Sequence, residues 1–191
     1  VAIATSEAEV RSRLHDAAGV SIAAVNGPQS VVISGDADAV LEVAERFSAA
    51  GVKTSRLRVS HAFHSAHMDG MLDAFRSVVE KLSFEAPRIP VVSNVTGVLA
   101  TAEELCSPEY WVRHVREAVR FADGIRALHA EGVSRFLELG PDGVLTAMTR
   151  GCLPDDSEAL LLPSLRRDRP EAETLLGAVS GLHVHGVEID W

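Results

Sequence analysis

The chain has 191 residues, a hydrophobic fraction of 47% and a formal net charge of −9 at pH 7, which fits one globular domain or two small ones. The acidic balance argues against nucleic-acid binding, because contact with phosphates needs a basic face. The two cysteines, Cys106 and Cys152, are too few for a disulfide scaffold, and no run of about 18 apolar residues predicts a membrane span, so we expect a cytoplasmic protein.

The first 59 residues alternate between β-rich runs and helical patterns. Ser6 and Asp36 are typical residues at the start of a helix, and Gly19 and Gly51 are typical residues at the end of one. Strands are expected at 1–4, 20–25, 30–34 and 52–59, and helices at 6–19 and 37–50. The order β-α-β-β-α-β predicts a ferredoxin-like unit.

Residues 60–152 follow a different pattern, with helices between two apolar strands. The helices are expected at 68–82, 110–115, 121–131 and 144–150, and the strands at 88–95 and 134–139. Strands separated by helices predict a parallel sheet. Two strands are too few for a parallel sheet that is covered on both faces, and the chain lacks a starting Met, so we expect further strands upstream of Val1. The predicted class is α/β with an α+β insert.

The segment His61-Ala62-Phe63-His64-Ser65 lies between a predicted strand and a predicted helix. A histidine in such a loop is well placed to act as a general base, because loops carry chemistry and the flanking elements hold them. His61, His64 and His67 also have the spacing of metal ligands on a helix. The loop prediction and the lack of a neighbouring Cys or carboxylate argue against that reading, so no metal site is predicted.

The same segment resembles the His-Ala-Phe-His motif of acyltransferase domains in modular type I polyketide synthases that select malonyl-CoA. Four further stretches are similar to signatures of that family, in the same order: 20–35, 92–97, 110–116 and 137–145. Residues 162–169 and 183–191 resemble the linker that follows the acyltransferase in these synthases. A stand-alone malonyl transacylase of fatty acid synthesis lacks that linker.

The resemblance implies three segments and one reaction. The segments are a ferredoxin-like small subdomain at 1–59, the C-terminal part of an α/β-hydrolase-like large subdomain at 60–152, and the post-acyltransferase linker at 153–191. The reaction is transfer of a malonyl unit from malonyl-CoA to the phosphopantetheine thiol of an acyl carrier protein through an acyl-serine. The domain would bind no cofactor of its own. Its partners would be the carrier protein, the neighbouring ketosynthase and linker domains, and the missing N-terminal part of the acyltransferase.

Carried over to this sequence, the family's site falls on a few residues. His64 matches the catalytic histidine, and His114 matches the position whose backbone carbonyl holds that imidazole. His61 and Phe63 fill the substrate-selectivity positions, where a bulky Phe would leave little room for an α-methyl branch. Ala118 stands where the family usually has Pro, and we expect local loosening there.

The family's nucleophilic serine lies in a Gly-His-Ser-x-Gly turn, and the sequence contains no Gly-x-Ser-x-Gly. The oxyanion-hole donor and the arginine for the malonyl carboxylate also lie upstream in the family, so none of Arg56, Arg58, Arg113 and Arg116 is assigned that role. We therefore expect the chain alone to be inactive. Two alternatives remain: a non-catalytic docking or linker unit of a synthase, and a stand-alone fatty acid malonyl transacylase.

Overall fold

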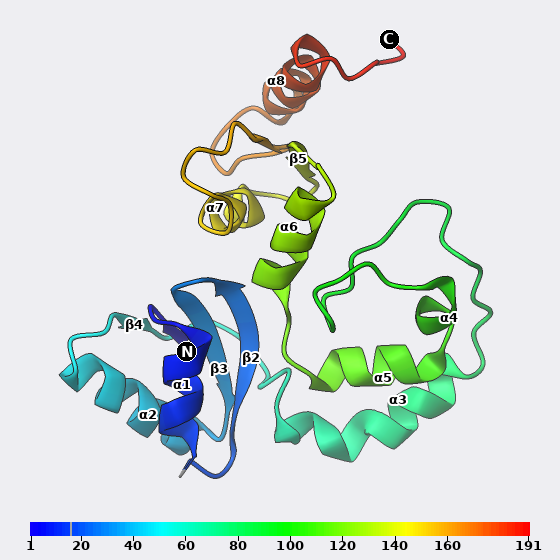
Figure 1. The fold of residues 1–191 in the computed structure, drawn as a ribbon. Coiled ribbons are helices and arrows are strands. Elements are labelled where there is room, and N and C mark those ends of the chain that lie inside the picture. Colours follow the sequence, from blue (N-terminus) through cyan, green and yellow to red (C-terminus); the bar gives the residue numbers. More distant parts are fainter. Residues whose placement is uncertain (16) are drawn as a thin grey trace. The chain divides into compact units, whose positions relative to one another are not determined.

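The computed structural model describes residues 1–15 and 17–191 (Figure 1). Contacts within the chain divide it into two compact units, Val1–Ala127 and Leu128–Trp191. The boundary falls inside helix α6 (Phe121–Ala130), whereas the sequence predicted boundaries after residues 59 and 152. That three-part division stays a prediction. Position 16, near the end of the first predicted helix, lies outside the described residues.

The N-terminal part of the first unit is a four-stranded antiparallel sheet with two helices. Its elements are β1 (Ala2–Ile3), α1 (Glu7–Leu14), β2 (Val20–Gly27), β3 (Ser30–Gly35), α2 (Ala37–Ala49) and β4 (Thr54–Ser55). The strand order is β2-β3-β1-β4, with β1 antiparallel to both of its neighbours. This is the ferredoxin-like arrangement, so the βαββαβ prediction is confirmed.

One face of this sheet and both helices form the core. Alternation along β3 places Val31 and Ile33 on the same face, where they lie with Ile3 of β1. The helices add Val10 of α1 and, from α2, Phe47, whose side chain is fully buried. Burial of a side chain of this size stabilises a fold by about 1.5–3 kcal/mol. The sheet and its two helices therefore share one hydrophobic core.

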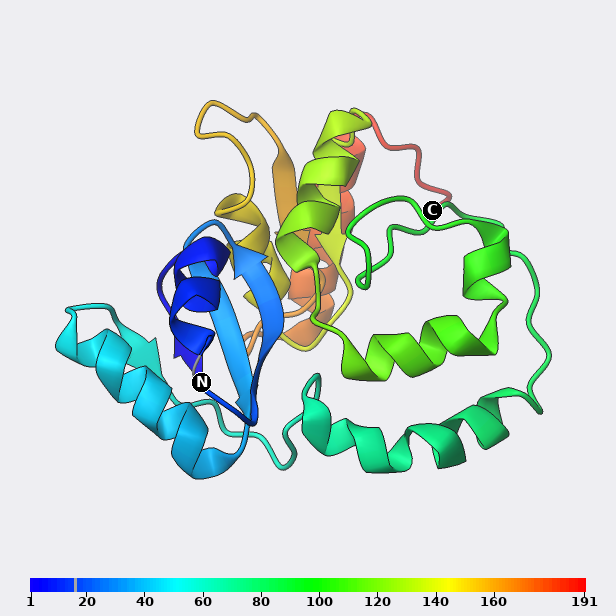
Figure 2. The same cartoon turned by 60° about the horizontal axis from the view of Figure 1, so that its bottom comes forward.

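The remainder of the first unit is helical. Its elements are a 3-10 helix η1 (Ala66–Met71), α3 (Leu72–Val79), α4 (Ala102–Leu105), α5 (Pro108–Arg116) and the start of α6. Helices α3 and α5 lie side by side (Figures 1 and 2). The helix predicted at 68–82 is therefore split into a 3-10 turn and a shorter α-helix. The short α4 escaped prediction, although Thr101 and Glu104 form a capping box at its start.

The strand predicted at 88–95 is wrong. The structure has only an isolated antiparallel bridge between Val92 and Leu99. Ser93 N–H donates to Val98 O at 2.8 Å, and Gly97 N–H donates to Ser93 O at 2.7 Å. Both backbone groups of Ser93 are therefore bonded within a tight local loop, and an apolar run need not join a sheet when a loop meets that demand.

The second unit has two parallel strands and two helices. Its elements are β5 (Arg135–Glu138), α7 (Val144–Arg150), β6 (Leu160–Pro163) and α8 (Glu171–Val184). The strand β5 pairs in parallel with β6, with Arg135 opposite Leu160. The parallel pairing was predicted, but the partner is β6 and not the run at 88–95. The carboxylate of Glu138 accepts hydrogen bonds from the backbone amides of Leu145 and Thr146 and fixes the start of α7.

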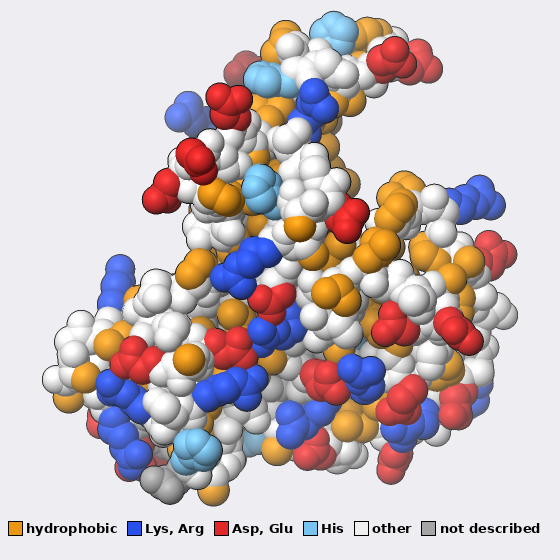
Figure 3. Space-filling model, viewed as in Figure 1, with side chains coloured by type: hydrophobic (Ala, Val, Ile, Leu, Met, Phe, Trp, Pro, Cys, Tyr) orange, Lys and Arg blue, Asp and Glu red, His pale blue; other side chains and the backbone are white. Residues whose placement is uncertain are grey.

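The surface of the first unit is a mixture of charges. Figure 3 shows acidic and basic side chains interspersed over the face in view. Ion pairs one helical turn apart include Arg11 with Glu7 and Arg46 with Glu42. Exposed pairs of this kind add little stability. None of the helices in the described residues is long and apolar enough to cross a membrane.

Candidate active site

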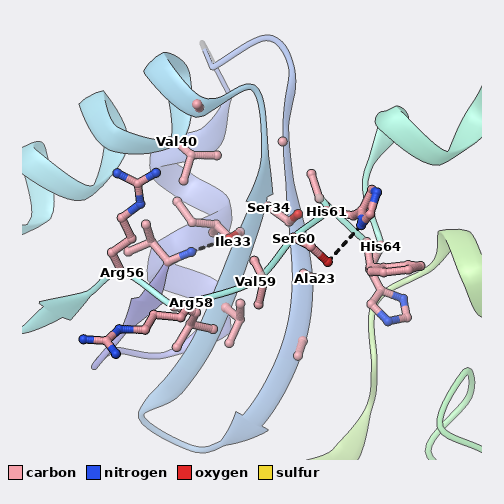
Figure 4. Close-up of a pocket in the computed structure, with 18 of the residues that line it drawn as sticks. Ala23, Ile33, Ser34, Val40, Arg56, Arg58, Val59, Ser60, His61 and His64 are labelled. Atoms are coloured by element: carbon pink, nitrogen blue, oxygen red, sulfur yellow. Dashed lines mark hydrogen bonds between the residues drawn. The ribbon is translucent and has the colours of Figure 1, made fainter.

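The segment from Arg56 to His64 lines an open cavity of about 690 Å³, together with residues of β2, β3 and α2 (Figure 4). His61 and His64 lie at one end of the segment. Arg56 and Arg58 lie at the other end, and their guanidinium groups point away from the two histidines (Figure 4). The cavity therefore has a histidine end and an arginine end, and neither arginine is placed beside the imidazoles.

His64 has an unusual backbone and a fixed side chain. Its φ is 57°, in the left-handed region that few non-glycine residues adopt. Its Nδ1 lies 2.7 Å from the backbone carbonyl oxygen of Glu117. Because a carbonyl can only accept, Nδ1 carries the proton, and the lone pair is on Nε2. An imidazole held in this way is oriented to take a proton at Nε2.

The assignment of this carbonyl to His114 is wrong. His114 lies inside α5, whose carbonyls run along the helix axis, whereas Glu117 is the first residue beyond α5 and is extended, with φ −82° and ψ 159°. The end of the helix frees the Glu117 carbonyl to face His64. The family pattern therefore predicts the correct segment, but it assigns the carbonyl to His114, three positions before Glu117.

The His114 side chain packs against aromatic rings of the same helix. Its ring lies 5.9 Å from the ring of Tyr110 and 6.2 Å from that of Trp111, centroid to centroid. Burial lowers the pKa of His114, and the positive charge of a protonated His64 lowers it further. Both effects favour the neutral form of the His114 imidazole.

Phe63 lies between two imidazoles. Its ring centroid is 6.0 Å from that of His61, edge to face, and 6.5 Å from that of His64. Phe63 is 52% exposed and lines the cavity, and His61 Nδ1 is held 2.9 Å from Ser60 Oγ. The two predicted selectivity residues are thus brought together beside the predicted base.

Ser65 was missed by the sequence analysis. It is fully buried, and its hydroxyl donates to Ala62 O at 2.6 Å and accepts from His67 N–H at 3.2 Å. These bonds close the turn in which His64 takes its left-handed conformation. A serine directly before a helix is a typical N-cap, and that signal could have found it.

His67 binds the ferredoxin-like sheet unit. Its Nε2 lies 2.7 Å from Oδ1 of Asp36, the residue that precedes α2. Asp36 was expected to cap α2, but its side chain makes no capping hydrogen bond. His61, His64 and His67 therefore contact three different partners. In the described ranges, 1–15 and 17–191, no cluster of three His, Cys, Asp or Glu side chains could hold a metal ion.

Residues 1–189 match the family model of the acyl transferase domain. The chain belongs to this family. Over its whole length it is 56% identical to the spectinabilin polyketide synthase system protein NorB of Streptomyces orinoci, and it covers 9% of that protein. It is 49% identical to the mycoketide-CoA synthase of Mycobacterium tuberculosis and covers 4% of it. The chain therefore spans a small part of these multidomain relatives.

Solved structures give the same family. The acyltransferase domain from the second module of the salinomycin polyketide synthase has a TM-score of 0.94 and 56% identity, over all of this chain and 44% of that one. A malonyl-CoA:acyl carrier protein transacylase from Xanthomonas oryzae has a TM-score of 0.81 and 26% identity, over 94% of this chain and 56% of that one. The α/β class and the resemblance to polyketide synthase acyltransferases are confirmed.

Proposed function

We propose that the chain is the C-terminal part of an acyltransferase domain that transfers a malonyl unit from malonyl-CoA to an acyl carrier protein during polyketide synthesis in the cytoplasm. The observation that carries this proposal is the His64 imidazole, with Nδ1 held by the Glu117 carbonyl and with no hydrogen bond to Nε2 among the described residues, in a chain of the acyl transferase family. Neither malonyl-CoA nor the carrier protein is a bound cofactor, and the phosphopantetheine belongs to the carrier.

The reaction uses His64 twice. Nε2 takes the proton of a serine hydroxyl, supplied by the part of the domain outside this chain, while the serine oxygen attacks the thioester carbonyl of malonyl-CoA. The thiolate of coenzyme A leaves and receives that proton from the imidazolium. The carrier thiol then gives its proton to Nε2, its sulfur attacks the acyl-serine, and the serine oxygen is reprotonated.

Selectivity is assigned to His61 and Phe63. The Phe63 ring lies beside the base, so an α-methyl branch on the extender would meet it. A contact with one extra carbon discriminates by about 1–3 kcal/mol, or roughly 10–200-fold. The malonyl transacylase among the structural neighbours supports malonyl as the substrate class.

The test is acyl-enzyme formation on the intact domain, followed by protein mass with malonyl-CoA and methylmalonyl-CoA in competition. A predominant malonyl adduct is expected, and His64→Ala is expected to slow its formation about 10²–10⁴-fold. Equal amounts of the malonyl and methylmalonyl adducts would contradict the selectivity role of Phe63. No adduct from the intact domain would reject the transferase and favour a docking or linker unit.

Two further arms separate the remaining alternatives. The chain by itself is expected to form no adduct, since a base without a nucleophile cannot form an acyl-serine. The loaded domain is then offered the carrier protein of a polyketide synthase and that of fatty acid synthesis. Preferred transfer to the fatty acid carrier would favour the stand-alone transacylase.

A further inference from the structure

The segment that supplies the Glu117 carbonyl is attached to the edge of the ferredoxin-like sheet. Val119 forms a parallel bridge with Ala24 of β2: Val25 N–H donates to Val119 O at 2.8 Å, and Val119 N–H donates to Ala23 O at 2.9 Å. The partner of the His64 ring is therefore two residues away from a strand edge of the small sheet.

The next residue, Arg120, joins two helices through its guanidinium group. Its Nη1 lies 2.7 Å from Oε1 of Glu7, the first residue of α1, and its Nε lies 2.7 Å from Oδ2 of Asp123 in α6. Its backbone N–H donates to Asn94 O at 2.7 Å. The side chains of Arg120, Glu7 and Asp123 are only 24%, 21% and 31% exposed. Partly buried charge-assisted bonds of this kind are stronger and more directional than exposed pairs.

The electrostatics agree with a tight contact. The hydrogen bond from Arg120 lowers the pKa of Glu7, against the effect of burial, and the same bond raises the pKa of Arg120. The backbone of Gly97 also lies close to the group: a Cβ at that position would lie 2.4 Å from Cβ of Asp123. We call Glu7, Arg120 and Asp123 the Arg120 clamp.

The peptide between Glu117 and Ala118 lies between two backbone anchors, the hydrogen bond from Glu117 N–H to Arg113 O at 2.8 Å and the bonds of Val119 to β2. The Glu117 carboxylate pairs with Arg113, but both side chains are nearly half exposed, and such a pair is weak. In the described part of the chain, the Ala118 N–H donates to no backbone carbonyl. Alanine also leaves φ free, where a proline would fix it. Orientation of the Glu117 carbonyl therefore depends on the end of α5 and on the residues that follow it.

We infer that Arg120 is a positioning residue for the base: by binding Glu7 and Asp123, it fixes the segment whose Glu117 carbonyl holds Nδ1 of His64. This inference rests on the proposed function, and it deepens it. Loss of the clamp lets the carbonyl turn away, so His64 samples the tautomer with the proton on Nε2, which cannot accept a proton from the serine.

The test compares Arg120→Met with Arg126→Met in the intact domain. Arg126 is the matched control, because its Nη1 lies 2.9 Å from Oδ1 of the same Asp123, and Glu7 is not its partner. We expect Arg120→Met to lower the rate of acyl-enzyme formation about tenfold, as expected for a misplaced catalytic group, and Arg126→Met to change it less than twofold.

The second readout is ¹⁵N NMR of the His64 ring at a pH of about 8.5, where an ordinary imidazole is neutral. The wild type should show a single tautomer with the proton on Nδ1, Arg126→Met the same, and Arg120→Met a mixture. A general loss of stability would not change the tautomer. If Arg120→Met does not fold, Glu7→Gln replaces it, since this change keeps the side-chain shape and removes only the charge.

Each outcome decides the inference. A folded Arg120→Met or Glu7→Gln protein in which His64 keeps one tautomer and acylates within twofold of the wild type overturns it. Equal losses in the Arg120 and Arg126 variants overturn it as well. If the wild-type domain forms no acyl-enzyme, the proposed function fails, while the tautomer measurement still tests the clamp.

Discussion

His67 Nε2 lies 2.7 Å from Oδ1 of Asp36, so the residue three positions after the proposed base is bound to the residue that precedes α2. The Glu117 carbonyl accepts from Nδ1 of His64 and belongs to a segment that is bonded to β2. The histidine loop is thus attached at two points to the same small sheet unit.

The contact between His67 and Asp36 should be worth a small amount of stability. Asp36→Asn keeps a side chain suited to the start of a helix and removes the charge, so the free energy of unfolding should fall by about 0.2–1 kcal/mol, as for other exposed pairs. Asp38→Asn in the first turn of α2 is the control. A double-mutant cycle with His67→Gln measures the coupling, and a zero coupling energy would contradict the pairing.

The left-handed backbone at His64 predicts a difference between two substitutions that both remove the base. Asparagine tolerates positive φ better than alanine does, and an unfavourable residue there costs about 1 kcal/mol or more. His64→Asn should therefore unfold at a higher temperature than His64→Ala, while both lose acylation. Equal melting temperatures in thermal unfolding would argue against a strained turn.

His114 should make stability depend on pH. Burial lowers its pKa in the folded state, so below the unfolded value of about 6.5 the unfolded chain binds more protons than the folded one. Stability is therefore present above pH 6.5 and is lost as the pH falls from there through the folded pKa. Urea unfolding between pH 8 and 5 should show a smaller loss for His114→Gln than for the wild type; an unchanged pH slope would contradict this.

Glu7 should act at lower pH, and its contribution to stability is likewise lost as the pH falls. Its pKa is lowered by Arg120, so its contribution to stability is present above the ordinary glutamate value of about 4.3 and is lost as the pH falls through the lower folded value. Glu7→Gln should reduce stability at neutral pH and reduce the further loss below pH 4.3. A Glu7→Gln protein with the acid sensitivity of the wild type would contradict the pairing.

Ala118→Pro should stabilise the chain. The preceding Glu117 has ψ 159°, which a following proline accepts, and the Ala118 N–H donates to no backbone carbonyl in residues 1–15 and 17–191. Loss of freedom in the unfolded chain is worth about 0.4–1 kcal/mol. Thermal unfolding measures it, with Ala62→Pro in the histidine loop as a contrasting variant that should destabilise. A lower melting temperature for Ala118→Pro would show that its backbone does not suit proline.

Local patterns were enough for the order of elements in the ferredoxin-like unit, although the strand expected at 52–59 is only Thr54–Ser55 in the structure. Periodicity and cap or turn residues indicate its helices and strands, and the order of these elements then predicts the strand order of the sheet. The same patterns failed at residues 88–95, where apolar character was taken for a strand. Whether such a run pairs depends on an available strand edge, and a sequence window does not contain that information.

The site was predictable only where side chains carry it. His61, Phe63 and His64 stand together in the sequence and also in the structure. The partner of Nδ1 is the main-chain oxygen of Glu117, and the identity of a side chain does not predict a contact made by the main chain. The carbonyl that holds Nδ1 was therefore misassigned to His114, three positions before Glu117. The Arg120 clamp escaped notice for a related reason, since Glu7 and Arg120 are 113 positions apart.

The bridge between Val119 and Ala24 has a consequence for synthase engineering. A hybrid that replaces only the His-Ala-Phe-His loop leaves both sides of this bridge in place. A hybrid with a crossover between β2 and residue 117 takes Ala24 and Val119 from different parents. The segment that holds the base is then bonded to a strand of the other parent. Crossover points that keep β2 and residues 117–120 from one parent should give more active hybrids than points between them.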